Sequence, residues 1–201
     1  VAEDDDDRTM MSFLAARGFD RGPAQFPELR GPYLGQKTPG KTSEVFAPGL
    51  VSGRYSLHGN VVFTPDGKEA LWSLMGGRAV VSRLIDGRWT YPRKVSYGGT
   101  ALEDVPCYHP DRTRLYDMAR RPFPGGRDTQ KENIWVWDKS PDGWTNPRPL
   151  AGEINDLPQH WQFSVDRAGN VYFTTTIQGS SAADIYVSRF VNGRYEKPEN
   201  L

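Results

Sequence analysis

The fold of this chain is decided by three stretches that repeat one pattern: Phe63–Trp72 (FTPDGKEALW), Tyr108–Tyr116 (YHPDRTRLY) and Phe163–Phe173 (FSVDRAGNVYF). Each stretch reads as the end of a strand, a turn centred on an Asp, and a second strand that finishes on an aromatic residue. Asp, Gly and Pro favour such turns because they tolerate or preset the backbone angles that a turn requires. The sequence therefore holds three related strand–turn–strand units.

A second motif follows each unit, in Ala79–Trp89, Ile134–Trp144 and Ile185–Tyr195. Each is an apolar strand, an Asp-Gly or Asn-Gly pair, and an aromatic residue. Such pairs favour the two-residue turn of a β-hairpin, because both residues tolerate a positive φ. Two hairpins in a repeat of about fifty residues are typical of a four-stranded antiparallel propeller blade. We therefore predict an all-β chain, a β-propeller with three blades in this chain.

The repeats also predict the organisation of the chain. Residues 1–56 form an N-terminal extension, and the three blades cover residues 57–99, 100–150 and 151–201. Within the extension we expect an acidic tail, a short helix over Thr9–Arg17, a wrapping coil rich in Pro and Gly, and one edge strand near Glu44–Ala47.

Composition excludes some partners. The 201 residues include 25 Lys and Arg and 25 Asp and Glu, and their formal net charge is +0. A neutral chain without a basic stripe is a poor candidate for binding nucleic acid or an anionic membrane. No apolar run approaches the roughly 20 residues that a membrane-spanning helix needs. The single cysteine, Cys107, excludes an internal disulfide, and we expect a small buried side chain there.

The repeats resemble the WD40-like β-propeller repeat of TolB-type proteins. Phe63–Lys68 (FTPDGK), His160–Ser164 (HWQFS) and Asp184–Leu201 carry the resemblance, together with the lead-in Gly31–Gln36 (GPYLGQ). It implies an exported bacterial propeller of unassigned function, periplasmic or extracellular, whose ring closes with six blades. The opening Val1-Ala2 before an acidic run fits the remainder of a cleaved export signal, or the edge of a fragment.

Three blades are half of a six-bladed ring and cannot close it. The outer faces of the end blades would then expose contiguous apolar surface, which soluble monomers rarely tolerate. Two chains pairing as three plus three around a two-fold axis would solve this, and so would a longer protein. We expect the homodimer. In a longer protein, the strand near Glu44–Ala47 could complete a blade as an added, protective edge strand.

Candidate site residues gather at the predicted mouth of the channel. His58 and His160 fall just before channel-lining strands, and Glu103 and Asp104 take the matching place in the second repeat. Histidines and a carboxylate could bind a divalent metal, which makes His58 and His160 weak metal candidates. Hydrogen-bonded or solvated histidines are the alternative, and we predict no cofactor.

The longest loop between strands should project on the same side. It carries Arg120, Arg121 and Arg127, whose guanidinium groups can hold a carboxylate or phosphate by two hydrogen bonds. With Trp161, which follows His160, these arginines join His58, Glu103, Asp104 and His160 as predicted ligand-binding residues.

Two other motifs have structural explanations. Asp66, Asp111 and Asp166 lie in turns, where an Asp hydrogen-bonds its own backbone, so we predict no catalytic role for them. Gly35–Thr42 fits the phosphate-loop pattern, but Pro48 and Gly49 cut off the helix that such a loop requires.

The sequence favours a non-catalytic binding or assembly module, which would bind another protein or a second copy of itself. It contains no GxSxG or HExxH motif. One alternative is a carbohydrate-active enzyme, a glycoside hydrolase or lyase, in which Glu103 and Asp104 supply carboxylates and His160 a base. The other is a structural filament subunit.

Overall fold

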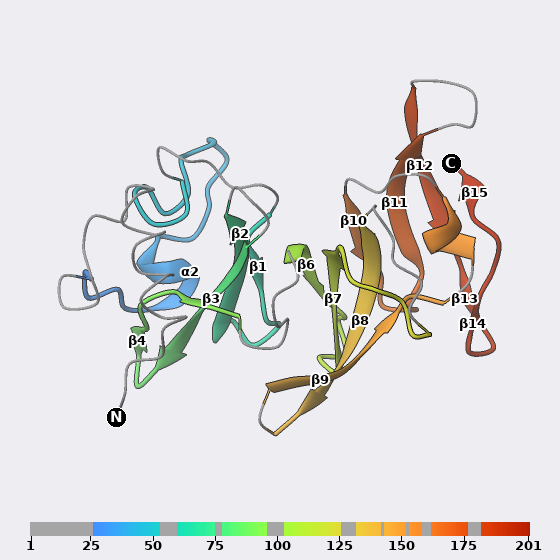
Figure 1. Cartoon of the computed structure of the whole chain (residues 1–201). Coiled ribbons are helices and arrows are strands. Elements are labelled where there is room, and N and C mark those ends of the chain that lie inside the picture. Colours follow the sequence, from blue (N-terminus) through green and yellow to red (C-terminus); the bar gives the residue numbers. More distant parts are fainter. Residues whose placement is uncertain are drawn as a thin grey trace. The chain divides into compact units, whose positions relative to one another are not determined.

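The computed structural model describes residues 26–52, 60–74, 78–95, 103–125, 132–141, 143–151, 153–157, 162–176 and 182–201. The chain forms two compact units, Val1–Ser96 and Tyr97–Leu201 (Figure 1). Among the described residues, no helix is long and apolar enough to cross a membrane.

Blade 1 lies in the first unit and is built on two long central strands. β2 (Glu69–Leu74) pairs antiparallel with β3 (Arg78–Ile85). The shorter strands complete the sheet at its edges: β1 (Val62–Phe63) on β2, and β4 (Arg88–Trp89) and β5 (Arg93–Lys94) on β3. Asp86 and Gly87 between β3 and β4 have φ of 49° and 74°, so the predicted two-residue turn is formed.

The segment before blade 1, residues 26–52, which we call the lead-in from here on, covers one face of this sheet. Leu34, Leu50 and Val51 are buried against Trp72 and Val80 in one core. Two hydrogen bonds fix the lead-in at the blade's edge: the Trp89 backbone N–H donates to Leu29 O at 2.9 Å, and the Trp89 indole Nε1 donates to Gly31 O at 2.7 Å. The short helical turn α2 (Pro32–Gly35) follows directly and brings Leu34 inward.

The edge strand expected over Glu44–Ala47 is not formed. Ala47 has φ of 41°, and its carbonyl accepts hydrogen bonds from Leu50 N and Val51 N. The segment therefore turns back on itself instead of extending along an edge. The helix expected over Thr9–Arg17 lies outside the described residues.

Blade 2 opens the second unit with four strands in sequence order: β6 (Glu103–Tyr108), β7 (Arg114–Ala119), β8 (Asn133–Ser140) and β9 (Gly143–Pro149). The pairing is antiparallel throughout, and its register shifts between Asp104 and Cys107 in β6 and between Val136 and Asp138 in β8.

Blade 3 follows after a 3-10 turn, η2 (Glu153–Asp156). Its sheet has the order β10 (Phe163–Val165), β11 (Val171–Thr176), β12 (Ala183–Ser188) and β15 (Glu199–Asn200). Between β12 and β15 the chain forms a small hairpin of β13 (Phe190–Val191) and β14 (Arg194–Tyr195), visible beside β12 in Figure 1.

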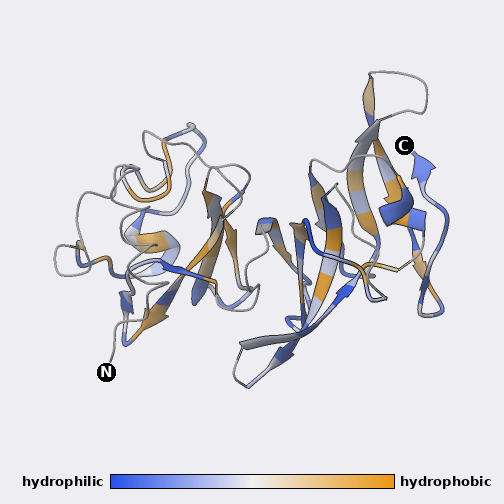
Figure 2. Ribbon diagram, in the orientation of Figure 1, coloured by the Kyte–Doolittle hydropathy of each residue, from blue (hydrophilic) through white to orange (hydrophobic). Residues whose placement is uncertain are grey.

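Blades 2 and 3 pack face to face on one core. Tyr116 and Met118 of β7 meet Val171 and Phe173 of β11 in a single apolar cluster. Figure 2 shows hydrophobic and polar residues alternating along β11, as expected for a strand with one buried face. In η2, the buried Asn155 side chain accepts from Ile134 N at 2.9 Å and donates to Leu150 O at 3.1 Å, which secures the link between the blades.

This contact defines two faces of every blade. We call the face of blade 2 that packs on blade 3 the following face, and the opposite one the preceding face. Alignment of the Asp-centred turns makes Leu71 and Ser73 of blade 1 equivalent to Tyr116 and Met118. Trp72 points to the other side of its strand. The lead-in therefore covers the preceding face of blade 1.

The predicted fold class is confirmed: the described chain is all-β except for two short turns of helix, and it is built of four-stranded antiparallel blades with the strand order of a β-propeller. The number of blades in a closed ring stays a prediction.

Candidate functional site

Half of the predicted site residues can be placed. The register Glu103↔Ala119 and Asp104↔Met118 sets the start of β6 beside the end of β7, from which Arg120 and Arg121 continue. The backbones of these four predicted residues therefore meet at one end of blade 2. The other predicted residues lie outside the described part of the chain: His58, Arg127, His160 and Trp161.

Asp104 is buried beside a strained strand. Its Oδ1 accepts a hydrogen bond from the backbone N–H of Val105 at 2.8 Å. Val105 has φ of 46°, which is rare for a β-branched residue, at the bulge of β6. Bulges of this kind re-aim side chains and are frequent near functional sites. The catalytic roles predicted for Glu103, Asp104 and His160 stay predictions.

The two placed arginines differ in their surroundings. Arg120 is exposed, and its Nε lies 3.6 Å from Glu132 Oε1. The Arg121 guanidinium instead lies over the rings of Trp137 and Trp135, at 4.7 and 5.4 Å from their centroids. Stacking on aromatic faces suits a guanidinium. Arg121 therefore fastens its loop to the preceding face of blade 2.

Asp117 is the buried carboxylate of that face. Its Oδ1 accepts a hydrogen bond from Trp137 Nε1 at 3.0 Å, and its side chain is fully enclosed. Loss of hydration raises the pKa of Asp117 to about 6, although the Trp137 hydrogen bond and the nearby Arg121 charge act in the opposite direction. The pKa of this carboxyl group therefore lies above the range of an ordinary Asp.

The opposite end of blade 2 holds a pocket that the sequence did not suggest. It has a volume of about 650 Å³ and is lined by Arg112, Thr113, Arg114, Asp138, Lys139, Ser140 and Pro141. β7 runs from Arg114 to Ala119, so at about 3.3 Å per residue the pocket lies roughly 16 Å from the predicted mouth. Arg114 and Asp138 are cross-strand partners, a proximity that only the register reveals.

A buried histidine, His109, contacts the side chain of Arg114, which lines the pocket. His109 Nδ1 lies 2.7 Å from Asp111 Oδ1 and 3.2 Å from the Asp111 backbone N, and His109 Nε2 lies 3.1 Å from Arg114 Nη2. Asp111 also accepts from Thr113 N and Oγ1, at 2.8 and 2.7 Å. These hydrogen bonds outweigh partial desolvation and lower the pKa of Asp111 to about 2.

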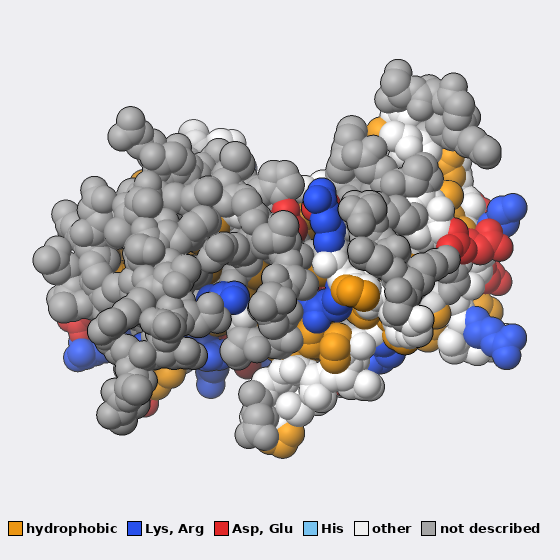
Figure 3. Space-filling model, in the orientation of Figure 1, with side chains coloured by type: hydrophobic (Ala, Val, Ile, Leu, Met, Phe, Trp, Pro, Cys, Tyr) orange, Lys and Arg blue, Asp and Glu red, His pale blue; other side chains and the backbone are white. Residues whose placement is uncertain are grey.

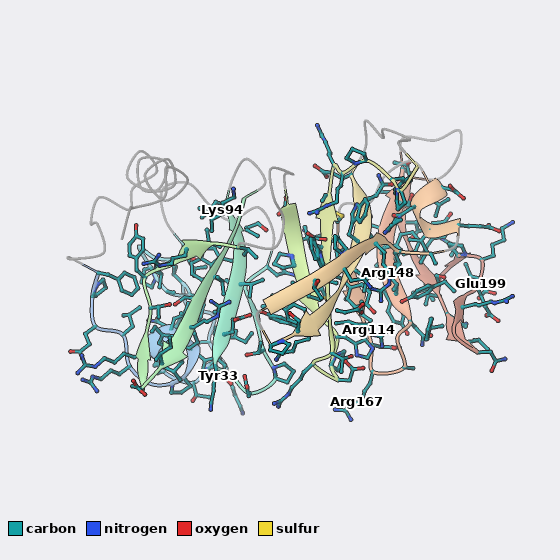
Figure 4. The ribbon with its side chains drawn as sticks, turned by 60° about the horizontal axis from the view of Figure 1, so that its bottom comes forward. Tyr33, Lys94, Arg114, Arg148, Arg167 and Glu199 are labelled. Carbon is teal, nitrogen blue, oxygen red and sulfur yellow. The ribbon has the colours of Figure 1, made fainter. Side chains whose placement is uncertain are left out.

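The second carboxylate of the pocket is held by Arg148. Its Nη1 and Nη2 donate to Asp138 Oδ2 and Oδ1 at 2.6 and 2.8 Å, and Asn146 Nδ2 adds a third bond at 3.0 Å. The Arg148 hydrogen bonds lower the pKa of Asp138. Figure 4 labels Arg114 and Arg148 in this part of the blade.

The Asp-centred turns have the structural role that we predicted. Asp66 Oδ1 accepts from Lys68 N and Thr64 Oγ1, and Asp166 Oδ1 accepts from Ala168 N and Asn170 N. Together with Asp111, each carboxylate closes its own turn.

Blade 3 differs from the others in its following face. Ile185 is 53 % exposed there, and its carbonyl accepts a hydrogen bond from Leu201 N at 3.0 Å, with Leu201 65 % exposed. Phe173 and Val171, on the preceding side of the same sheet, are fully buried. In the space-filling view, hydrophobic side chains reach the surface of this blade beside charged ones (Figure 3).

No protein-family model and no curated protein matches the chain. Solved structures that are similar include a chain of a nidogen/laminin complex, with 17% identity and a TM-score of 0.47 over 73% of this chain and 48% of that one. U3-55K has 12% identity and a TM-score of 0.42, over 73% and 53% of the two chains. The WD40 repeats of RRP9 have 12% identity and a TM-score of 0.43, over 73% and 52%. The chain spans about half the length of these three structures.

Proposed function

We propose that this chain is a non-catalytic binding and assembly module, and that it binds its partner through the following face of blade 3. The observation that carries the proposal is the contrast across one sheet. The preceding side buries Val171 and Phe173 completely, whereas Ile185 on the following side is 53 % exposed. On the same following side Val187 is only 1 % exposed, so the open part of this face is the part around Ile185. Exposed apolar area of this kind favours association.

The chemistry of this face suits a protein that presents a β-sheet. Besides Ile185 it offers Tyr172 and Thr174, both half-buried, with Ser164 on the neighbouring strand. An aromatic and an aliphatic side chain among hydroxyl groups match the mixed character of protein–protein interfaces. The contact between blades 2 and 3 supplies the template for such an occupant, because there the following face of blade 2 packs on another blade.

The same argument disfavours the predicted three-plus-three homodimer. A ring of two chains would place the following face of each blade 3 on the preceding face of the partner's blade 1. That face is covered by the lead-in, where Leu34 is fully buried and Gly31 O accepts from the Trp89 indole. Closure would therefore require the lead-in to leave its core, so we propose another protein as the partner.

We further propose that the chain belongs to an exported bacterial propeller of the TolB type and is located in the periplasm or outside the cell. The repeat motifs at Phe63–Lys68 and Asp184–Leu201 support this. Expression of the full gene with a reporter, followed by cell fractionation, tests it, and a reporter found only in the cytoplasm contradicts it.

The decisive experiment compares two isoleucines of equal exposure. Ile185 is 53 % exposed on the proposed surface, and Ile85 is 55 % exposed at the end of β3 in blade 1. A photo-crosslinking amino acid is placed at each position in the producing cell, and the products are identified by mass spectrometry. We expect one defined protein adduct from position 185, lost in a Thr174→Lys variant, and none from position 85.

Equal labelling from both positions would refute the proposal. If the adduct from position 185 joins two copies of this chain, the partner is a second copy and not another protein. Sedimentation of the wild type and of Ile185→Lys then separates these cases, because only a self-associating chain loses mass in the variant.

A further inference from the structure

The polar chemistry of blade 2 departs from that of its two neighbours in sequence. In blade 1, Arg83 Nε meets Glu69 Oε2 across the strands at 2.7 Å. In blade 3, the equivalent Arg189 lies 3.8 Å from Glu199. Blade 2 reverses the two charges: Arg114 stands at the position of Glu69, and its cross-strand partner Asp138 stands at the position of Arg83. The Asp138 carboxylate receives its two shortest hydrogen bonds from Arg148, at 2.6 and 2.8 Å.

A second position changes in the same place. Ser82 and Ser188 are buried and donate hydrogen bonds to Thr90 O and Glu196 O at 2.7 and 2.6 Å. Their equivalent in blade 2 is Trp137, whose Nε1 donates to Asp117 Oδ1 instead. In blade 2 the ion pair of Arg148 with Asp138 joins the third and fourth strands beside the pocket.

The described pocket and its supports carry more positive than negative charge. The basic side chains are Arg112, Arg114, Lys139 and Arg148, and they meet two carboxylates. Asp111 is engaged by Thr113, by His109 and, at 3.5 Å, by Arg114, and Asp138 is engaged by Arg148. Hydrogen bonds to these carboxylates lower the pKa of both groups. Because basic side chains outnumber carboxylates here, the site favours an incoming anion.

The basic side chains stand on a rigid base. Arg114 is half-buried and hydrogen-bonds His109, which is only 3 % exposed. The Lys139 backbone N–H donates to Thr113 O at 2.9 Å, which joins the two turns that line the pocket. The Lys139 ammonium lies 5.9 Å from the Trp144 ring centroid. Such support reduces the entropy lost when a ligand is bound.

We infer that this end of blade 2 is a binding site for an oxyanion, a carboxylate or phosphate group, held by Arg112, Arg114 and Lys139. Guanidinium groups recognise both anions by paired hydrogen bonds, and an ammonium adds a point charge. The site is independent of the proposed partner surface on blade 3 and of the predicted mouth.

The test uses matched pairs of variants in the intact chain. Arg112 and Arg167 both follow the turn Asp of their blades, but only Arg112 lines the pocket; Arg167 is labelled in Figure 4. Arg189 of blade 3 is an exposed cation outside the pocket and serves as the control for Lys139. The amide NMR spectrum of each protein is titrated with sodium phosphate and with sodium malonate, against sodium chloride at equal ionic strength.

We expect saturable changes in the amide chemical shifts of Thr113, Lys139 and Ser140 with phosphate, malonate or both. The anion that binds more tightly identifies whether the site prefers phosphate or carboxylate groups. Arg112→Gln and Lys139→Gln should each weaken binding by about tenfold, the effect of one charged contact. Arg167→Gln and Arg189→Gln should leave it unchanged.

Three results would overturn the inference: shifts no larger than those with chloride, equal weakening by the control variants, or full binding by the Arg112→Gln/Lys139→Gln double variant. Unchanged shifts elsewhere in the spectrum verify that each variant is folded.

Discussion

The preceding face of blade 1 and the following face of blade 3 are both outer faces of described blades, yet only one is covered. On blade 1 the lead-in buries Leu34, Leu50 and Val51 against Trp72. On blade 3 the exposed fraction of Ile185 is 53 %. Within the described residues, the chain therefore covers the first of these faces and leaves part of the second exposed.

Substitutions in the covered face should lower the free energy of unfolding strongly. Leu34→Ala removes a side chain with 0 % exposure from the cap, and we expect it to lower the free energy of unfolding by about 2–5 kcal/mol. Urea denaturation checks this, with Val45→Ala, at a position 68 % exposed, as the control. A loss below about 0.5 kcal/mol, the scale of a surface change, would mean that the lead-in is not a cap.

The preceding face of blade 2 differs from that of blade 1 in one buried residue: it carries Asp117 where blade 1 carries Trp72. The pH dependence of stability shows what this buried carboxyl group costs. The folded state raises the pKa of Asp117 to about 6 from roughly 3.9 in unfolded chains. The folded protein thus binds more protons in this interval, and stability should fall by on the order of 2–3 kcal/mol as pH rises from about 4 to about 6.

Asp117→Asn should flatten that pH dependence while keeping an acceptor for Trp137 Nε1. Thermal melts between pH 4 and pH 7.5 measure the effect. An Asn variant with the slope of the wild type would assign the titration to another group.

The hydrogen bond that ties the lead-in to blade 1 should have a moderate value. Trp89→Phe removes the Nε1 donor to Gly31 O and part of a ring that is 4 % exposed. We expect a loss of about 1–2 kcal/mol. The equivalent Trp144 is half-buried on Tyr108, so Trp144→Phe should cost less; the reverse order would contradict the comparison.

Substitutions in the exposed part of the following face of blade 3 should hardly change the stability of the isolated chain. Ile185→Lys should alter the free energy of unfolding by no more than about 0.5 kcal/mol, because the side chain is already half in water. A large loss in urea denaturation would show that Ile185 is covered within the chain itself.

The sequence predicted what depends on neighbouring residues. Asp66, Asp111 and Asp166 close their turns, and Asp86-Gly87 and Asn192-Gly193 adopt positive φ. These features follow from turn chemistry within a few residues. The prediction of a strand over Glu44–Ala47 was wrong because Ala47 takes a left-handed backbone conformation, which the residue type alanine does not indicate.

What the sequence could not supply depends on contacts between distant segments. The cap joins Gly31 to Trp89, and no periodic pattern in the Pro- and Gly-rich lead-in indicates such a contact. The pocket joins Arg114 to Asp138 through the strand register. Aligning the repeats would have given one signal: Arg114 and Asp138 replace Glu69 and Arg83 of blade 1, so the two charges are exchanged. The predicted mouth residues gather only in part, with four of them on blade 2.

The chain's single thiol gives access to the joint between blades 2 and 3. Cys107 lies on β6, where burial raises its pKa despite a hydrogen bond with the Val165 backbone of β10. The side chain is half-buried and its pKa is raised, so we expect a slow reaction with a thiol reagent and a faster one when these inner strands part. The rate of modification, measured before and after a partner is added, would therefore report on movement at this joint.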